Sequence, residues 1–250
     1  MPLESLDSTA PGQPPAPRRI FSRTTGESRM TAEKKPLRVD VISDCVCPWC
    51  YVGKRNLDEA IARSEDRFDM EVHWHPFQLN PDLPAEGRDW KKYAAERFGS
   101  LERLRGMQVR LEEVGKAAGI DFAFDKVSRA VNTFEAHRLI ALAGLEGLQD
   151  EVAEGLFRAN FVDGADIGSR ETLLKVATAA GMDAERTSAM LESGEGEEQV
   201  RQGLEMARRI GVTGVPFFIV DGKYAVSGAQ PPEALVELFD HAAQGGGDEG

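Results

Sequence analysis

The chain has 250 residues, of which 41% are hydrophobic and 29% are charged, and these proportions are ordinary for a soluble globular protein. The formal net charge is −12 and no basic stripe stands out, which argues against a nucleic-acid-binding protein. No run approaches the roughly 20 apolar residues of a membrane-spanning helix. Only three cysteines are present, too few for a disulfide-stapled secreted protein. We therefore expect a cytoplasmic protein with neither nucleic acid nor membrane as a partner.

The two ends of the chain have compositions typical of disorder. The first 36 residues contain the run PGQPP and scattered charges, and they lack the apolar segment of a secretory signal. This predicts a disordered extension over residues 1–36. The Gly-rich residues 244–250 predict a flexible tail.

A strand, a dithiol motif, a helix and a second strand are predicted next. Residues 37–43 are enriched in β-branched side chains, which indicates a strand. The motif Cys-Pro-Trp-Cys follows at residues 47–50, and residues 51–64 repeat apolar side chains at helical spacing. Residues 68–75 alternate strictly between apolar and polar side chains, so we expect a strand that Pro76 ends.

A long helical block is expected over residues 89–210, followed by a return to strands. The predicted helices cover residues 101–118, a segment beginning at Asn132 or Thr133, and residues 151–161, 170–180, 183–191 and 197–210. Asp221-Gly222 lies between two apolar runs, as in a β-hairpin, and residues 231–243 predict a closing helix. This order predicts one α/β domain with a helical domain inserted in it.

The dithiol motif predicts redox chemistry. If the helix begins at the motif, unpaired backbone N–H groups and the helix dipole both lower the pKa of Cys47. Cys50 lies one turn away, close enough to resolve a mixed disulfide formed by Cys47. Pro48 fits the first helical turn, where its missing N–H has no helical partner. Trp49 is expected either to contact substrate or to pack against the domain.

The third cysteine and a pair of histidines favour ordinary structural roles. Cys45 is expected to be a small buried residue rather than a redox partner of Cys47, because a disulfide that brackets one residue is strained. His73 and His75 share one strand face, but two histidines are too few for zinc. We predict no metal and no organic cofactor, and an external thiol such as glutathione or a redox partner would reset the dithiol.

Several linked segments resemble those of one family. They are Asp44–Lys54 (DCVCPWCYVGK), Trp74–Pro81 (WHPFQLNP), Asn132–Leu139 (NTFEAHRL), Phe157–Ile167, Gly211–Pro216 and Ser227–Gln230 (SGAQ). In this order they are similar to segments of the DsbA-like thiol–disulfide oxidoreductases of the thioredoxin-fold superfamily. Within that family the chain resembles the FrnE-like branch, which is associated with polyketide-related dithiol–disulfide isomerases. The resemblance covers residues 37–240.

The resemblance implies a thioredoxin fold with a large inserted all-helical domain. The thioredoxin-like domain would comprise residues 37–87 and 211–243, and the inserted helical domain would comprise residues 88–210. It also implies a cis peptide bond between Val215 and Pro216. The substrate-binding loop that faces the dithiol would contain these two residues and those before them, Thr213 and Gly214.

Two further implications concern the surroundings of the dithiol. Relatives place the segment containing Asn132, His137 and Arg138 near the active-site groove, where a cation would stabilise a thiolate. Many members of the superfamily also carry a buried acid six residues before the nucleophilic cysteine, a position that Val41 occupies here. The proton acceptor for the resolving cysteine is therefore open, with water and Asp44 as candidates.

The favoured function is that of a thiol–disulfide oxidoreductase or isomerase, in which Cys47 attacks a disulfide of a protein or small molecule and Cys50 resolves the intermediate. One alternative is a glutathione-dependent isomerase or transferase. The similar 2-hydroxychromene-2-carboxylate isomerases and kappa-class glutathione transferases also insert helices in this fold, but they typically carry serine at the position of Cys47. Another alternative is a non-catalytic redox-sensing binding module. The oligomeric state stays open.

Overall fold

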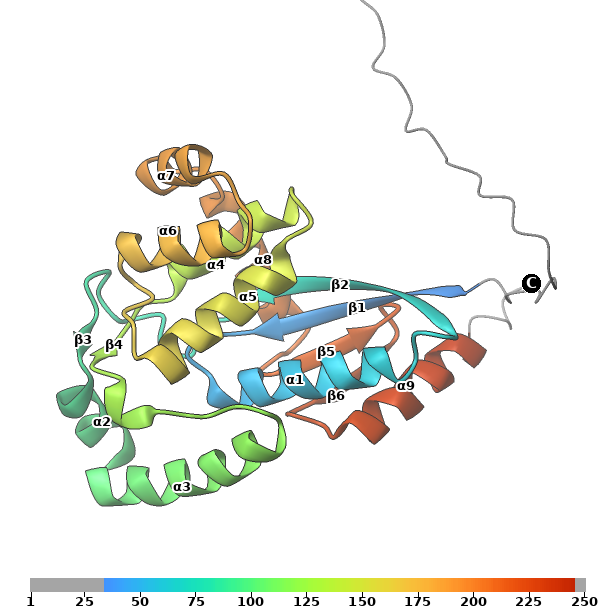
Figure 1. Ribbon diagram of the computed structural model, residues 1–250, viewed down its shortest axis with the longest axis horizontal. Coiled ribbons are helices and arrows are strands. Elements are labelled where there is room, and N and C mark those ends of the chain that lie inside the picture. Colours follow the sequence, from blue (N-terminus) through green and yellow to red (C-terminus); the bar gives the residue numbers. More distant parts are fainter. Residues whose placement is uncertain (1–33, 246–250) are drawn as a thin grey trace, which may run out of the picture. The chain divides into compact units, whose positions relative to one another are not determined.

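A four-stranded sheet lies at the centre of the part that the computed structural model describes, residues 34–245 (Figure 1). Its strands are β1 (Lys35–Ser43), β2 (Phe68–Pro76), β5 (Phe217–Val220) and β6 (Tyr224–Ser227), in the spatial order β2-β1-β5-β6. Strand β2 runs parallel to β1, whereas β5 is antiparallel to β1 and to β6. The expected strand order along the chain is confirmed.

Helices cover both faces of this sheet because its central strand is apolar on both faces. Val39 and Val41 of β1 join the main core with helices α1 (Pro48–Ala62) and α9 (Pro232–Gly245). Ile42 points to the opposite face, where it packs with residues that include Ala207 of helix α8 (Glu197–Arg209). Side chains of successive strand residues point to opposite faces, so β1 contributes to both layers.

The remaining elements lie between β2 and α8 in the sequence. The helices are α2 (Trp90–Phe98), α3 (Leu101–Ala117), α4 (Phe134–Gly144), α5 (Gln149–Arg158), α6 (Arg170–Ala179) and α7 (Ala184–Glu192). A short 3₁₀ turn, η1 (Phe124–Lys126), and a π-helical turn, η2 (Ala159–Asp163), accompany them, with two-residue strands β3 (Arg88–Asp89) and β4 (Arg129–Ala130). Side chains of Asp89, Ser100, Ser169 and Asp183 accept hydrogen bonds from backbone N–H groups in the first turns of α2, α3, α6 and α7, respectively, which fixes where these helices begin.

Several expected boundaries differ from the structure by a few residues, including those at both ends of the described part, and several small elements were not predicted. Strand β1 begins at Lys35, inside the segment predicted to be disordered, because its N–H donates to the Arg67 carbonyl as β1 pairs with β2. Helix α9 continues to Gly245, inside the predicted flexible tail. Residues 1–33 and 246–250 lie outside the described part, and the boundaries of the helical insert stay a prediction.

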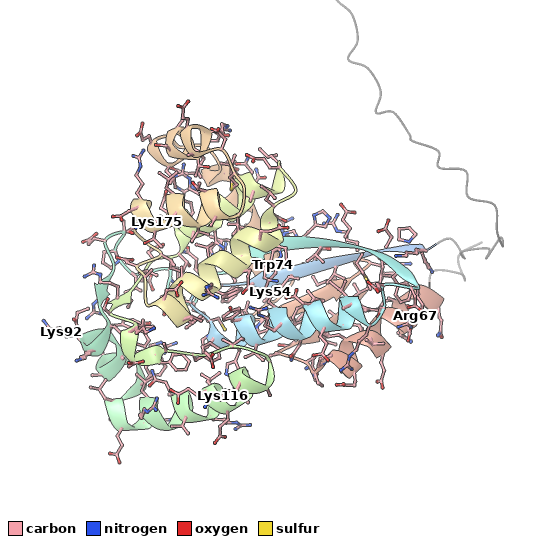
Figure 2. All side chains as sticks on the ribbon, in the orientation of Figure 1. Lys54, Arg67, Trp74, Lys92, Lys116 and Lys175 are labelled. Atoms are coloured by element: carbon pink, nitrogen blue, oxygen red, sulfur yellow. The ribbon has the colours of Figure 1, made fainter. Side chains whose placement is uncertain are left out.

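Aromatic rings and an ion network around the buried Lys54 join α5 to α1 and β2; Lys54 and Trp74 are labelled in Figure 2. The rings of Tyr51 and Phe157 stack with centroids 5.1 Å apart, and Trp74 meets Phe157 edge-on at 6.3 Å. The nearly buried Lys54 ammonium lies 2.9 Å from a carboxylate oxygen of Asp150 at the start of α5. These contacts fix the helical segment against the helix that carries the dithiol.

The outer edge of β2 is occupied by a side chain. Gln149 accepts a hydrogen bond from the Trp74 backbone N–H at 3.0 Å, and its amide group donates to the Trp74 carbonyl at 3.4 Å. One glutamine side chain therefore makes the pair of hydrogen bonds that a neighbouring strand would make. No helix within residues 34–245 is long and apolar enough to cross a membrane.

Asp40 of β1 predicts a specific acid sensitivity. Burial raises its pKa, but hydrogen bonds with His75, at 2.6 Å, and with Arg38 outweigh burial and hold the pKa well below its usual range. A depressed carboxyl pKa contributes stability above the unfolded pKa and loses it as pH falls. We expect Asp40→Asn to lower the free energy of unfolding by about 1–3 kcal/mol at neutral pH, with the difference shrinking below about pH 4. Urea unfolding across pH checks this, and a constant difference would contradict it.

Candidate active site

The thiol of Cys47 lies at the beginning of helix α1, as predicted. Cys47 is the N-cap residue with extended backbone angles, φ −96° and ψ 110°, and Pro48 is the first helical residue. The Cys47 carbonyl accepts the N–H groups of Cys50 and Tyr51, which starts the helix. The first turn contains no acidic side chain, and the Cys47 side chain makes no capping hydrogen bond to it.

The three thiols differ in their surroundings. All are free and buried, with Cys47 the most accessible at 5% exposure. Burial raises the pKa of Cys50 well above its usual value, and the neighbouring Cys47 raises it further. Burial and the Asp44 carboxylate raise the pKa of Cys45, which is a small buried residue next to β1 as expected. Cys50 is therefore a neutral thiol at neutral pH and has to lose a proton before it can attack a disulfide.

The loop before β5 lies directly against the dithiol. The Val215–Pro216 peptide bond is cis, and the Cys47 thiol donates to the Val215 carbonyl oxygen with a sulfur–oxygen distance of 3.6 Å. Pro216 is buried, Val215 and Gly214 are half-buried, and Thr213 is exposed. The structure thus contains the expected cis bond, and this loop faces the dithiol as expected.

A glycine that had no predicted role allows this contact. A Cβ atom on Gly53 of α1 would lie 2.9 Å from the Cγ atom of Pro216 and 3.2 Å from the ring of Phe218, closer than Cβ atoms normally approach other atoms. The signal was present in the sequence, because a glycine interrupts an otherwise regular helix. Spacing alone does not reveal which neighbour requires it.

Apolar surface is exposed around the dithiol motif and the loop after β2. Trp49 is 37% exposed, and Leu79 is 38% exposed. A large ring next to Cys47 that is not packed into the core is available to a bound molecule, which favours the substrate-contact interpretation of Trp49 over the packing one.

The resembled segments meet at this loop after β2. His137 Nε2 lies 2.8 Å from the Phe77 carbonyl, and the Leu79 N–H donates to an Asp44 carboxylate oxygen at 2.7 Å. The Asn132 side chain accepts from Gln78 at 2.8 Å and donates to the Leu83 carbonyl at 2.7 Å. Asn132 and His137 therefore hold the loop against the residues that precede the dithiol.

Arg138 is buried and directed at the connection between α7 and α8, and its predicted place near the active-site groove stays a prediction. Its side chain is 3% exposed, and its guanidinium donates to the carbonyls of Met190 and Glu195 at 2.8 Å each and to the Ser193 carbonyl. These carbonyls belong to the end of α7 and the segment before α8. The guanidinium is therefore occupied by hydrogen bonds to the backbone that connects α7 with α8.

The two strand histidines have carboxylate neighbours. His75 pairs with Asp40, and His73 Nε2 lies 2.9 Å from a Glu71 carboxylate oxygen. Within residues 34–245, no group of three or more histidine, cysteine, aspartate and glutamate side chains is arranged to hold a metal ion.

The fold and the dithiol define a class of protein. A family model described as the DSBA-like thioredoxin domain matches residues 38–240, so the chain belongs to this family. The fold is the thioredoxin fold of the DsbA-like thiol–disulfide oxidoreductases, elaborated by many helices, and membership supports a redox enzyme.

Individual relatives agree with this assignment. A solved structure of a probable DsbA oxidoreductase from Streptomyces coelicolor is 32% identical, with a TM-score of 0.76 and coverage of 83% of this chain and 90% of that chain. The uncharacterized protein YwbO of Bacillus subtilis (strain 168) is 29% identical over 194 residues, 77% of this chain and 90% of that protein. The cytosolic disulfide reductase DsbM from Pseudomonas aeruginosa, 20% identical with a TM-score of 0.56 and coverage of 83% and 96%, shares the fold.

The accessibility and helix position of Cys47 predict selective alkylation. With limiting iodoacetamide, we expect Cys47 to react at least about tenfold faster than Cys45 or Cys50, because the pKa of each of these two thiols is raised by burial. Mass spectrometry of peptides from the reduced protein measures the three rates. Equal labelling of Cys45 and Cys47 would contradict the assignment of the nucleophile.

The hydrogen bonds of Arg138 predict a stability role. Arg138→Ala removes a buried guanidinium together with its hydrogen bonds to three carbonyl groups and to the Glu135 carboxylate, so we expect it to lower the free energy of unfolding by about 3–5 kcal/mol. Arg208→Ala is the matched control, because Arg208 is exposed and its loss should cost no more than about 1 kcal/mol. Urea unfolding measures both. An Arg138 variant with normal stability but slowed alkylation of Cys47 would instead restore the groove interpretation.

Proposed function

We propose that the protein is a thiol–disulfide oxidoreductase or isomerase in which Cys47 is the nucleophile and Cys50 the resolving thiol. One observation carries the proposal: Cys47 caps α1, with its sulfur 3.6 Å from the Val215 carbonyl beside cis-Pro216. The helix N-terminus and the adjacent cis-proline loop place the Cys47 sulfur where an extended substrate can meet both the thiol and the loop backbone.

The reaction proceeds by two sulfur displacements. The Cys47 thiolate attacks a substrate disulfide, one substrate sulfur leaves as a thiolate, and a mixed disulfide forms. Cys50 then loses its proton and attacks the Cys47 sulfur, which releases the second substrate thiolate and leaves a Cys47–Cys50 disulfide. Two electrons pass from the protein dithiol to the substrate, and an external thiol such as glutathione or a redox partner returns them.

Substrate recognition is assigned to the surface around Cys47. The loop of Thr213, Gly214 and Val215 supplies backbone groups that pair with an extended peptide or a peptide-like thiol, independently of its side chains. The exposed Trp49 ring adds an apolar contact at the sulfur that is attacked. This surface fits a disulfide-containing protein or small molecule.

The cytoplasm and the FrnE-like branch are part of the proposal. A chain with three cysteines, two of them in one motif, is suited to a reducing compartment in which dithiols are catalytic. The name of the fold neighbour DsbM, a cytosolic disulfide reductase, is compatible with that compartment. Because the FrnE-like branch is associated with dithiol–disulfide isomerases, disulfide isomerisation is included among the proposed reactions.

Small-molecule isomerisation with glutathione and non-catalytic redox sensing are the competing functions. Glutathione-dependent isomerisation needs no second thiol, so the presence of Cys50 one turn along α1 favours disulfide chemistry over it. A redox sensor would form the same Cys47–Cys50 disulfide without turning over a substrate, so catalytic reduction or oxidation of a disulfide substrate separates an enzyme from a sensor.

The test is a redox titration of the full chain. After equilibration in graded glutathione buffers, thiol trapping and mass spectrometry are expected to find a reversible Cys47–Cys50 disulfide. A midpoint of about −120 to −180 mV indicates an oxidant or isomerase, and about −270 mV a reductant. Cys45→Ser should leave the midpoint unchanged, whereas Cys50→Ser should trap a Cys47–glutathione mixed disulfide. If no Cys47–Cys50 disulfide forms at any potential, disulfide exchange is excluded and glutathione-dependent chemistry becomes the leading function.

A further inference from the structure

The segment Ser227–Gln230 begins at the last residue of β6 and leads to helix α9. The pairing of β5 with β6 continues one step beyond the two strands, because the Gly228 N–H donates to the Pro216 carbonyl at 2.8 Å. Gly228 has a φ of +85°, a backbone conformation that favours glycine. The carbonyl of the cis-proline is therefore bound to this segment.

The same segment is bound to helix α1 by one side chain. The side-chain amide of Asn56, a half-buried residue, donates to the Gln230 carbonyl at 2.8 Å. The Gln230 N–H in turn donates to the Gly228 carbonyl at 2.8 Å, which closes a tight turn between them. A path of three hydrogen bonds thus leads from Asn56 on α1 to the carbonyl of Pro216.

Asn56 and Gly53 lie on one face of α1, because residues three positions apart on a helix are neighbours. Gly53 allows the close contact with Pro216 before β5, and Asn56 binds the segment after β6. Both ends of the β5–β6 hairpin are therefore attached to the helix that begins at Cys47. An apolar contact such as that of Gly53 has no preferred direction, whereas a hydrogen bond does. Asn56 therefore restrains both the separation and the relative orientation of α1 and the hairpin.

We propose that Asn56 is a positioning residue for substrate binding, which fixes the spacing between the cis-proline loop and Cys47 through residues 228–230. The proposal rests on the proposed function, in which an extended substrate pairs with the loop backbone while Cys47 attacks its disulfide. Both can occur at once only if the loop keeps its spacing from α1, which places the Cys47 sulfur 3.6 Å from the Val215 carbonyl oxygen. Asn56 lies more than two turns along α1 from Cys47, so it acts through the loop and not on the sulfur.

The test compares two disulfides that release the same coloured thiolate. One is a small aromatic disulfide (Ellman's reagent), and the other is an extended peptide whose cysteine is joined to one half of that reagent. Reduced full-length protein is mixed with each, and the rate of the first coloured phase, which reports attack by Cys47, is measured against substrate concentration. Only the peptide has a backbone that can pair with the cis-proline loop.

Asn56→Leu and Asn56→Asp are the informative variants, because both side chains have nearly the shape of asparagine and neither donates a hydrogen bond at neutral pH. We expect each to raise the half-saturating concentration of the peptide at least about fivefold, the effect of losing one hydrogen bond, and to leave the limiting rate unchanged. The reaction with the aromatic disulfide should keep its wild-type rate.

Arg63→Ala is the matched control on the same helix. It removes exposed ion pairs with Glu59 and with Glu233 of α9, so it should change neither reaction. Thermal unfolding checks that each variant is folded. Asn56→Leu introduces no charge, so it carries the test if Asn56→Asp does not fold.

The outcomes distinguish this inference from the proposed function. Folded Asn56 variants that slow both disulfides equally, or neither, assign Asn56 a purely structural role and overturn the proposal. An effect of Asn56→Asp without one of Asn56→Leu belongs to the new charge and also overturns it. If the wild-type protein reacts with both disulfides but the peptide does not saturate it, the loop does not bind substrate and the positioning role is wrong. If the wild-type protein releases no coloured thiolate from either disulfide, the proposed function itself fails.

Discussion

The close contact between helix α1 and the loop before β5 is the constraint on which the site depends. It is possible because Gly53 has no side chain where a Cβ atom would lie 2.9 Å from Pro216. Strand β5 pairs with β1, and α1 follows β1 directly in the chain. The contact between Gly53 and Pro216 therefore joins β1, α1 and β5. The beginning of α1 is thereby held beside the Val215 carbonyl, and the position of Cys47 follows from backbone packing rather than from its own side-chain contacts.

The two thiols of the motif acquire different properties from the same helix. Cys47 precedes the first turn and is the more accessible of the two thiols, whereas Cys50 lies within the turn and is more deeply buried. Burial that keeps Cys50 neutral protects the reduced protein from unwanted reactions but makes proton removal part of the resolving step.

Local patterns in the sequence predicted the strands of the four-stranded sheet, most helices and the helix start at Cys47. Each of these features depends on residues that are neighbours in the chain. The two-residue strands β3 and β4 were missed because a pair of residues has no periodicity. The direction of Arg138 could not be inferred, because its acceptor carbonyls lie more than fifty residues further along the chain. A cavity lined by residues that include Ser43, Trp74 and His137 could not be predicted for the same reason, because these residues come from three distant segments of the chain.

The glutamine at the edge of β2 has a consequence for the behaviour of the protein at high concentration. An edge strand with free N–H and C=O groups is a template on which strands of other molecules can add. Gln149 occupies both backbone groups of Trp74, near the C-terminal end of the outer side of β2. The first residue of α5 thus interrupts the row of pairing groups and disfavours edge-to-edge aggregation.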